Sequence, residues 1–314
     1  MQICGATTDL AVEAHDALRG RAGGEIPGVS VQRETFPFGH VTTVRILDEV
    51  GAARMGRPVG NYITIEAPAI RTGDRRAHEG VVRVLAKKLQ ELIHVPTEAG
   101  ILIVGLGNWN ATPDALGPRV VDNCPVTRHL FVHAPEEVQP GMRPVSALAP
   151  GVLGTTGIET AEIIKGVVEK TRPALIIAVD SLAARNVERI ATTIQVADTG
   201  IAPGSGIGGG RAGINEETLG VKVIAIGVPT VVHAAFIAHD AISYLFERRP
   251  GGFPDEKAIE GVIQRLLSPF GGRLMVTPKE IDALIQNCAR IIAGGILSAL
   301  QPGIPAEHYA AYLQ

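Results

Sequence analysis

Residues 174–180 read Ala-Leu-Ile-Ile-Ala-Val-Asp, an almost wholly apolar run that ends in an acid. Two further runs of this kind are Ile101–Gly105 and Val223–Gly227. Such runs are typical of central strands in a parallel sheet, which are covered on both faces. Stretches with helical spacing of apolar residues lie between or beside them, at 81–93, 158–170 and 231–246. This alternation predicts an α/β fold with a doubly wound core of three αβα layers.

The two ends of the chain differ from this core. The first 75 residues read as extended structure, so we expect a β-rich addition over 27–70, with strands at Val29–Phe36, Val41–Leu47 and Tyr62–Glu66. Thr192–Val196 is a further strand candidate. Towards the other end, an excursion over 249–276 precedes a helix expected at Pro278–Leu300, with Thr277 as its N-cap and Glu280 at the capping-box position.

Length and composition exclude several classes of protein. The chain has 314 residues, 46% of them apolar, and a formal net charge of −3, which argues against intrinsic disorder and against a nucleic-acid or polybasic membrane-surface binder. The three cysteines are far apart and form no Cys-x-x-Cys pair, so neither a disulfide framework nor a zinc site is indicated. The start lacks the features of a signal peptide, and no apolar run reaches the ~18 residues of a membrane span. We expect a cytoplasmic protein.

Candidate functional residues follow the apolar runs, because ligands in open α/β sheets gather beyond the carboxyl ends of the strands. Asp180 ends one run, Asp114 lies in the loop after another, and His233 follows the third. Asp180 is either a catalytic or metal-binding carboxylate or the N-cap of a helix starting near Ser181. Asp114 alone fits a solvated turn or a helix N-cap better than a catalytic role. His233 is better explained as a polar residue whose hydrogen bonds are satisfied within the fold than as a metal ligand.

Taken together, the two acids suggest a specific chemistry. Two carboxylates within hydrogen-bond reach cannot both ionise easily, so one proton is shared and the two pKa values separate. Such a pair suits acid–base hydrolysis of a peptide bond: one member activates water while the other protonates the carbonyl or the leaving amine.

Two other motifs match known functional patterns only in part. Asp198-Thr199-Gly200 is the tripeptide of pepsin-like aspartic proteases, but only one copy occurs and the β/α alternation does not fit that fold. The stretch 204–210 matches a G-x-G-x-x-G pattern without the helix and acid-tipped strand of a dinucleotide site. We interpret both as parts of a substrate-binding or gating loop, whose candidate residues are Asp198, Gly204, Ser205, Gly206 and Gly208.

At these residues the chain resembles the germination protease family of spore-forming bacteria, which consists of aspartic-type endopeptidases with a fold related to that of hydrogenase-maturation proteases. The likeness covers most of residues 7–300. It is carried by the stretches Thr8–Ala14, Gly105–Asn110, Thr112–Pro118, Ala149–Val152, Thr156–Thr160, Ala178–Asp180, Asp198–Gly208, Ile224–Val232 and Val276–Asp282.

The resemblance implies an endopeptidase that degrades small acid-soluble spore proteins at germination, with Asp114 and Asp180 as the catalytic pair. It also implies a homotetramer in the forespore and spore core, made as a zymogen that cuts its own N-terminal segment. The matching bond here is Asp9–Leu10, an acid followed by a large apolar residue, as in the family's substrates. Residues 1–9 would then be a pro-segment and 10–314 a single catalytic domain. No cofactor, nucleic acid or membrane is implied.

Two alternatives remain open. The first keeps the fold but makes the endopeptidase metal-dependent, as in the hydrogenase-maturation proteases, with His233 as a candidate nitrogen ligand. The second is a non-catalytic protein that only binds small spore proteins.

Overall fold

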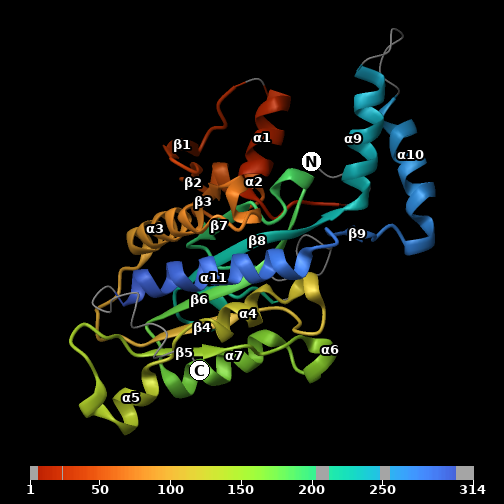
Figure 1. Ribbon diagram of the computed structural model, residues 1–314. Coiled ribbons are helices and arrows are strands. Elements are labelled where there is room, and N and C mark those ends of the chain that lie inside the picture. The colour runs from red at the N-terminus through yellow and green to blue at the C-terminus, as the bar shows by residue number, and fades with distance from the viewer. Residues whose placement is uncertain (1–5, 23, 203–211, 248–254, 302–314) are drawn as a thin grey trace.

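The computed structural model describes residues 6–22, 24–202, 212–247 and 255–301. In these residues one mixed sheet runs through the molecule, with helices on both faces (Figure 1). The strand order is β1-β2-β3-β7-β8-β6-β4-β5, and β9 pairs with β8. The expected α/β core with helices on both sides of the sheet is therefore confirmed.

The strands, in chain order, are β1 (Val29–Phe36), β2 (Gly39–Ile46), β3 (Gly60–Glu66), β4 (Ile101–Gly105), β5 (Val145–Leu148), β6 (Leu175–Ala184), β7 (Thr193–Ala197), β8 (Val223–His233) and β9 (Met275–Val276). The α-helices are α1 (Ala11–Ala22), α2 (Glu49–Met55), α3 (Arg75–Leu92), α4 (Leu116–Asp122), α5 (Arg128–His133), α6 (Leu153–Thr156), α7 (Thr160–Thr171), α8 (Glu216–Leu219), α9 (Ala234–Glu247), α10 (Glu256–Leu267) and α11 (Ile281–Leu300).

The sheet has a parallel and an antiparallel half. Strands β5, β4, β6 and β8 are parallel, whereas β7, β3, β2 and β1 continue the sheet antiparallel beyond β8. The β-rich addition expected over 27–70 is thus an extension of the same sheet rather than a layer stacked on it. It is joined through β7, which lies between β3 and β8.

The two faces of the sheet are covered differently. Helices α3, α4 and α11 cover one face (Figure 1). Their buried side chains belong to a single large apolar cluster. The other face carries two separate clusters, one under α7 and α8 and one under α1 and α2. Because side chains alternate along a strand, consecutive residues such as Tyr62 and Ile63 of β3 belong to opposite faces.

Two local expectations were wrong. The first 75 residues contain α1 and α2 besides their strands; α1 is short of large apolar residues, so the helical spacing was not visible there. Helix α11 begins at Ile281 without a side-chain cap, so Thr277 is not its N-cap. The Thr277 hydroxyl instead donates to the carbonyl of Thr230 at 2.9 Å. That bond ties the start of α11 to β8.

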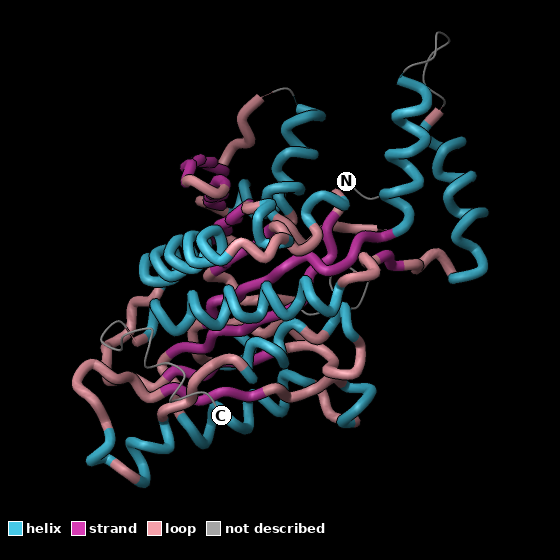
Figure 2. Tube along the Cα trace, viewed as in Figure 1, coloured by secondary structure: helices cyan, strands magenta, loops and turns pink. Residues whose placement is uncertain are grey.

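The expected excursion over 249–276 lies partly outside the described residues. Its described part contains α10, which runs beside α9 at the edge of the molecule (Figure 2). In the part of the chain that the structure describes, α11 is the one helix long and apolar enough to cross a membrane, and 67% of its apolar window is buried inside the protein. The central helix of a soluble core has the same character, and α11 packs along α3 and α4.

Candidate active site

Asp180 lies within a strand, not at its end. β6 continues to Ala184, so the interpretation of Asp180 as the N-cap of a helix near Ser181 is wrong. The neighbouring strand β4 does end here, because its last residue, Gly105, pairs with Val179. Asp180 is therefore the first residue of β6 beyond the end of β4, and only 6% of its surface is exposed. Its Oδ1 accepts the backbone N–H of Ser181 at 2.9 Å.

Asp114 is placed by the loop that follows β4. It ends a short 3-10 helix, η2 (Thr112–Asp114), and its Oδ2 accepts the N–H of Asn108 at 2.8 Å. The same N–H also donates to the backbone carbonyl oxygen of Asp114, with the nitrogen 3.1 Å from that oxygen. Gly107 permits this closure, because its φ is +110° and a Cβ there would lie 2.0 Å from that oxygen. The loop after β4 is thus folded back so that Asp114 returns to the end of β4.

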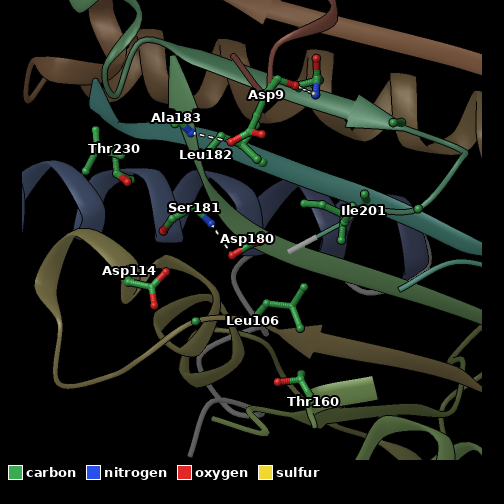
Figure 3. A pocket seen from close by; sticks show the side chains of 18 of the residues that line it. Asp9, Leu106, Asp114, Thr160, Asp180, Ser181, Leu182, Ala183, Ile201 and Thr230 are labelled. Carbon is green, nitrogen blue, oxygen red and sulfur yellow. Dashed lines mark hydrogen bonds between the residues drawn. The ribbon is translucent and has the colours of Figure 1, made fainter. Parts of the chain in front are cut away.

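Both acids line one cavity of about 650 Å³ (Figure 3). Its walls include Tyr62 and Ala197 from the α1–α2 side and Leu106 and Ile201 from the α7–α8 side. The cavity therefore opens where the two clusters on this face leave the middle of the sheet uncovered. The structure brings the two predicted acids to one site from different elements.

The predicted processing site lies in the same cavity. The Asp9 N–H donates to the Ala183 carbonyl at 3.0 Å, and Asp9 Oδ2 accepts the Ala183 N–H at 2.9 Å (Figure 3). Gln195 of β7 holds both sides of the Asp9–Leu10 junction: its Nε2 donates to the Asp9 carbonyl at 3.1 Å, and its Oε1 accepts the Ala11 N–H at 2.7 Å. Leu10 itself is fully buried in the apolar core.

A buried carboxylate anchors the start of α1 next to this junction. Glu13 accepts the N–H groups of Arg185 at 2.8 Å and Asn186 at 3.0 Å, and its Oε1 lies 3.3 Å from Arg189 Nε. The Thr8 hydroxyl also donates to Glu13. These bonds fix the chain on both sides of residues 9 and 10 to the end of β6.

His233 does not belong to this site. It is the last residue of β8, six positions beyond the Gly227 that pairs with Asp180, and it does not line the cavity. Its Nδ1 accepts the Ala235 N–H at 3.1 Å, its ring meets Phe236 edge-on, and burial lowers its pKa. Its ring is thus hydrogen-bonded to the start of α9, outside the cavity that the two acids line. Among the described residues, no three His, Cys, Asp or Glu side chains gather where they could share a metal ion.

The candidate gating loop is described only at its start. Both carboxylate oxygens of Asp198 accept hydrogen bonds from Asn61, from its backbone N–H at 2.8 Å and from its Nδ2 at 2.6 Å. Asp198 thus joins the end of β7 to β3, while the following residues, 199–202, line the cavity. Gly204, Ser205, Gly206 and Gly208 lie outside the described residues.

Several cavity residues were not found from the sequence. Gln195 had a detectable signal, because it is a polar residue inside the buried strand Thr193–Ala197. Arg57 lies in the loop after α2, where the sequence contains no pattern that would mark it as a cavity residue. Ser181 and Thr230 have buried hydroxyls for which the described residues offer no hydrogen-bond partner. Thr230 sits at a bulge: Leu182 pairs with Pro229 and Ala183 with Val231, which leaves Thr230 without a cross-strand partner.

Comparison with known proteins identifies the family to which the chain belongs. The family model described as germination protease matches residues 6–252 and 250–313. The chain belongs to the germination protease family. Germination proteases of Caldanaerobacter subterraneus, Clostridium tetani and Bacillus thuringiensis are 51%, 46% and 45% identical to it. The matches cover 96%, 98% and 97% of this chain and 96%, 98% and 96% of the respective relatives.

Membership of the germination protease family makes the chain a peptidase, as the sequence predicted. Among solved structures, a NiFe hydrogenase maturation protease from Thermococcus kodakarensis matches with a TM-score of 0.35 and 18% identity. That match covers 68% of this chain and 98% of the archaeal protein.

Proposed function

We propose that this member of the germination protease family is an endopeptidase that degrades small acid-soluble spore proteins during germination, with Asp114 and Asp180 as an acid–base pair. The observation that carries the proposal is that both acids, from the β4–η2 loop and from β6, line one cavity. One carboxylate accepts a proton from the attacking water, and the other, protonated, donates to the carbonyl or to the leaving amine. Burial of Asp180 favours the sharing of one proton.

Substitution of Asp180 by Asn tests this mechanism. Asp180→Asn and Asp114→Asn should each lower kcat for a small acid-soluble spore protein by at least about 10²- to 10⁴-fold, the usual contribution of acid–base catalysis. Asp282→Asn is the matched control, because Asp282 is exposed on α11 outside the cavity. Retention of near wild-type activity by Asp180→Asn, with circular dichroism unchanged, would end the proposal.

The same experiments separate the two alternatives. Loss of activity with a chelator, together with a stoichiometric metal in the purified protein, would favour the metal-dependent endopeptidase. Binding of the spore protein without the appearance of fragments would favour the non-catalytic binder.

We further propose that the protein is a zymogen in which the Asp9–Leu10 bond is cut by the same pair. Asp9 lines the cavity, but it lies beside Ala183, three residues along β6 from Asp180, which is about 10 Å at ~3.3 Å per residue. The bond is therefore held near the two acids rather than between them. Cutting requires either a shift of the segment or the cavity of a second molecule.

Mass spectrometry of Asp114→Asn, alone and mixed with wild type, tests this processing. The variant alone should keep Met1–Asp9. Removal of those residues only in the mixture would indicate cutting between molecules, whereas removal in the isolated variant would assign the trimming to another protease. A homotetramer in the forespore and spore core belongs to the same proposal, and sedimentation of the purified protein measures its oligomeric state.

A further inference from the structure

Glu13 is an acid in the first turn of α1, next to the bond that we propose is cut. Only 7% of its surface is exposed, and its carboxylate accepts the backbone N–H groups of Arg185 and Asn186. These two residues follow directly on β6, whose residue Ala183 belongs to the wall of the catalytic cavity. Glu13 therefore joins the start of α1 to the end of β6.

The Thr8 hydroxyl lies between Glu13 and the backbone nitrogen of Leu10. The Leu10 N–H donates to the Thr8 hydroxyl oxygen at 3.1 Å, and the same hydroxyl donates to Glu13 Oε2. Leu10 directly precedes α1, and Glu13 is the third residue of that helix. This is the spacing of a capping box, in which the acid at the third helical position reaches back to the N–H of the residue before the helix. Helix geometry thus allows Glu13 to reach the Leu10 nitrogen once Thr8 is gone.

A cut between Asp9 and Leu10 changes the charge at this place. Hydrolysis adds the hydroxyl of water to the Asp9 carbonyl carbon and its proton to the Leu10 nitrogen, and the new amine takes up a second proton from the new carboxyl group. Such an α-amino group is mostly protonated at pH 7, because its ordinary pKa is about 7.7–8.0. Thr8 leaves with residues 1–9, so Glu13 Oε2 loses a donor at the same moment. A buried carboxylate without its donor and an ammonium group without an acceptor are both unfavourable, and each supplies what the other lacks.

The start of α1 is anchored independently of residues 1–9. The side chains of Leu10 and Val12 are buried in the large apolar cluster, and that of Ala11 is buried in the cluster under α1 and α2. The Ala11 N–H donates to Gln195 Oε1 at 2.7 Å. These contacts are not made by residues 1–9, so they hold the Leu10 nitrogen within reach of Glu13 after a cut.

We propose that Glu13 is the receptor for the α-ammonium group that a cut at Asp9–Leu10 creates, and that this ion pair keeps the end of β6 in position in the processed enzyme. The inference rests on the proposed processing at that bond. Before the cut, Asp9 holds the cavity wall directly through its two hydrogen bonds to Ala183. Those bonds are lost with residues 1–9, whereas the bonds from Glu13 to the N–H groups after β6 are not. Glu13 acts through the wall rather than on the substrate, so it is a positioning residue.

A chain that an added protease cuts before Leu10 tests the receptor without relying on self-processing. Residues 5–9 are replaced by a sequence after which enteropeptidase cuts, and a second version carries one extra Gly before Leu10. The extra residue moves the ammonium group by about 3.8 Å along the chain, away from Glu13. The extra Gly and Glu13→Gln should each lower kcat for a small acid-soluble spore protein by about 10- to 100-fold. This range corresponds to the contribution of about 1.5–3 kcal/mol from a hydrogen bond to a charged group.

Combining the two changes separates an ammonium receptor from a merely structural residue. If Glu13 acts by binding the ammonium group, Glu13→Gln should lower kcat by less than about threefold in the chain with the extra Gly, because the ion pair is already broken there. A structural role predicts the same loss in both chains. Acylation of the Leu10 amine, followed by mass spectrometry, measures the ion pair directly and should be at least about tenfold faster in Glu13→Gln than in the wild type.

Glu162→Gln is the matched control, because Glu162 is also the third residue of a helix, α7, but is exposed and does not line the cavity. Circular dichroism establishes that each variant is folded; if Glu13→Gln does not fold, the chain with the extra Gly decides. Equal losses from Glu13→Gln in both chains, or no loss from the extra Gly, overturn the receptor and leave the proposed processing intact. If cutting by enteropeptidase produces no gain in activity, the zymogen proposal fails and the receptor with it.

Discussion

The two faces of the sheet differ in what covers them. One is closed: α3, α4 and α11 bury a continuous apolar cluster that reaches from β2 to β5. The other is open in the middle, because α1 and α2 cover one end and α7 and α8 the other. The two proposed catalytic acids line the cavity that this gap creates, together with the N-terminal segment. The closed face thus holds the larger apolar core, and the gap on the open face holds the proposed site.

The hydroxyls at the cavity and the thiols on the closed face offer a second comparison. Buried polar groups usually have hydrogen-bond partners, and one without a partner is unfavourable by about 1–3 kcal/mol. Two such groups, the hydroxyls of Ser181 and Thr230, line the cavity. The thiols of Cys124 and Cys288, by contrast, belong to the apolar cluster of the closed face. These differences can be tested one residue at a time.

The largest effect is expected on the closed face. Leu85 of α3 is fully buried against α11, and a Cβ on Gly295 would lie 2.5 Å from its side chain. Leu85→Ala should lower the free energy of unfolding by about 2–5 kcal/mol, because a helix pair packed this closely cannot collapse into the space left behind. Urea denaturation measures this change. Leu92 lies at the end of the same helix and is half-buried, so Leu92→Ala should lower the free energy of unfolding clearly less. Equal decreases for the two variants would mean that the closed face is not tightly packed.

A smaller effect is expected from the floor of the cavity. Gln195 is 8% exposed and makes two hydrogen bonds to the segment around Asp9 and Leu10. Gln195→Met should lower stability by about 1–3 kcal/mol, since it leaves the Ala11 N–H without its acceptor. It should also speed hydrogen exchange at that amide. Gln32→Met on the exposed side of β1 is the control and should change neither quantity.

The two buried thiols of the closed face should make the stability of the folded protein depend on pH. Burial raises the pKa of Cys124 and of Cys288 from 9.0 to about 12. Each thiol keeps its proton in the folded protein at pH values where the unfolded chain has lost it, so stability is full below about pH 9 and falls as the pH rises. The slope is at most about 1.4 kcal/mol per pH unit for each thiol.

Urea denaturation at pH 8 and pH 10 measures this slope. The variant with both Cys124→Ala and Cys288→Ala should lose less stability between the two pH values than the wild type does. An identical loss would show that the thiols are not shielded from water.

The smallest effect is expected at Thr230. Its hydroxyl has no hydrogen-bond partner in the part of the chain that the structure describes, so Thr230→Val should leave stability unchanged or raise it by up to about 1 kcal/mol. Thr127→Val is the matched comparison: both threonines are 1% exposed, but the Thr127 hydroxyl donates to the Arg143 carbonyl at 2.5 Å and accepts the Val145 N–H at 2.9 Å. That variant should lose about 1–3 kcal/mol. A comparable loss from Thr230→Val would place its hydroxyl in a hydrogen bond.

Much of the closed face could be predicted from the sequence. The apolar runs Ile101–Gly105 and 174–179 gave β4 and the first half of β6, and helical spacing gave α3. These patterns are local, because a strand that is covered on both faces has mostly apolar side chains whatever lies next to it in space. The continuation of β6 through Asp180 was missed for the same reason, since a charged residue in a buried strand breaks the pattern.

The sequence by itself determined the α/β class, the central strands and the two acids that follow β4 and interrupt β6. Only the tertiary structure decided that Asp9, Arg57 and Gln195 meet in the cavity that those acids line. They come from the N-terminal segment, from the loop after α2 and from β7, and no spacing along the chain connects them. Their contacts depend on the strand order, which places β7 against β8 and leaves the edge of β6 open beyond the end of β4.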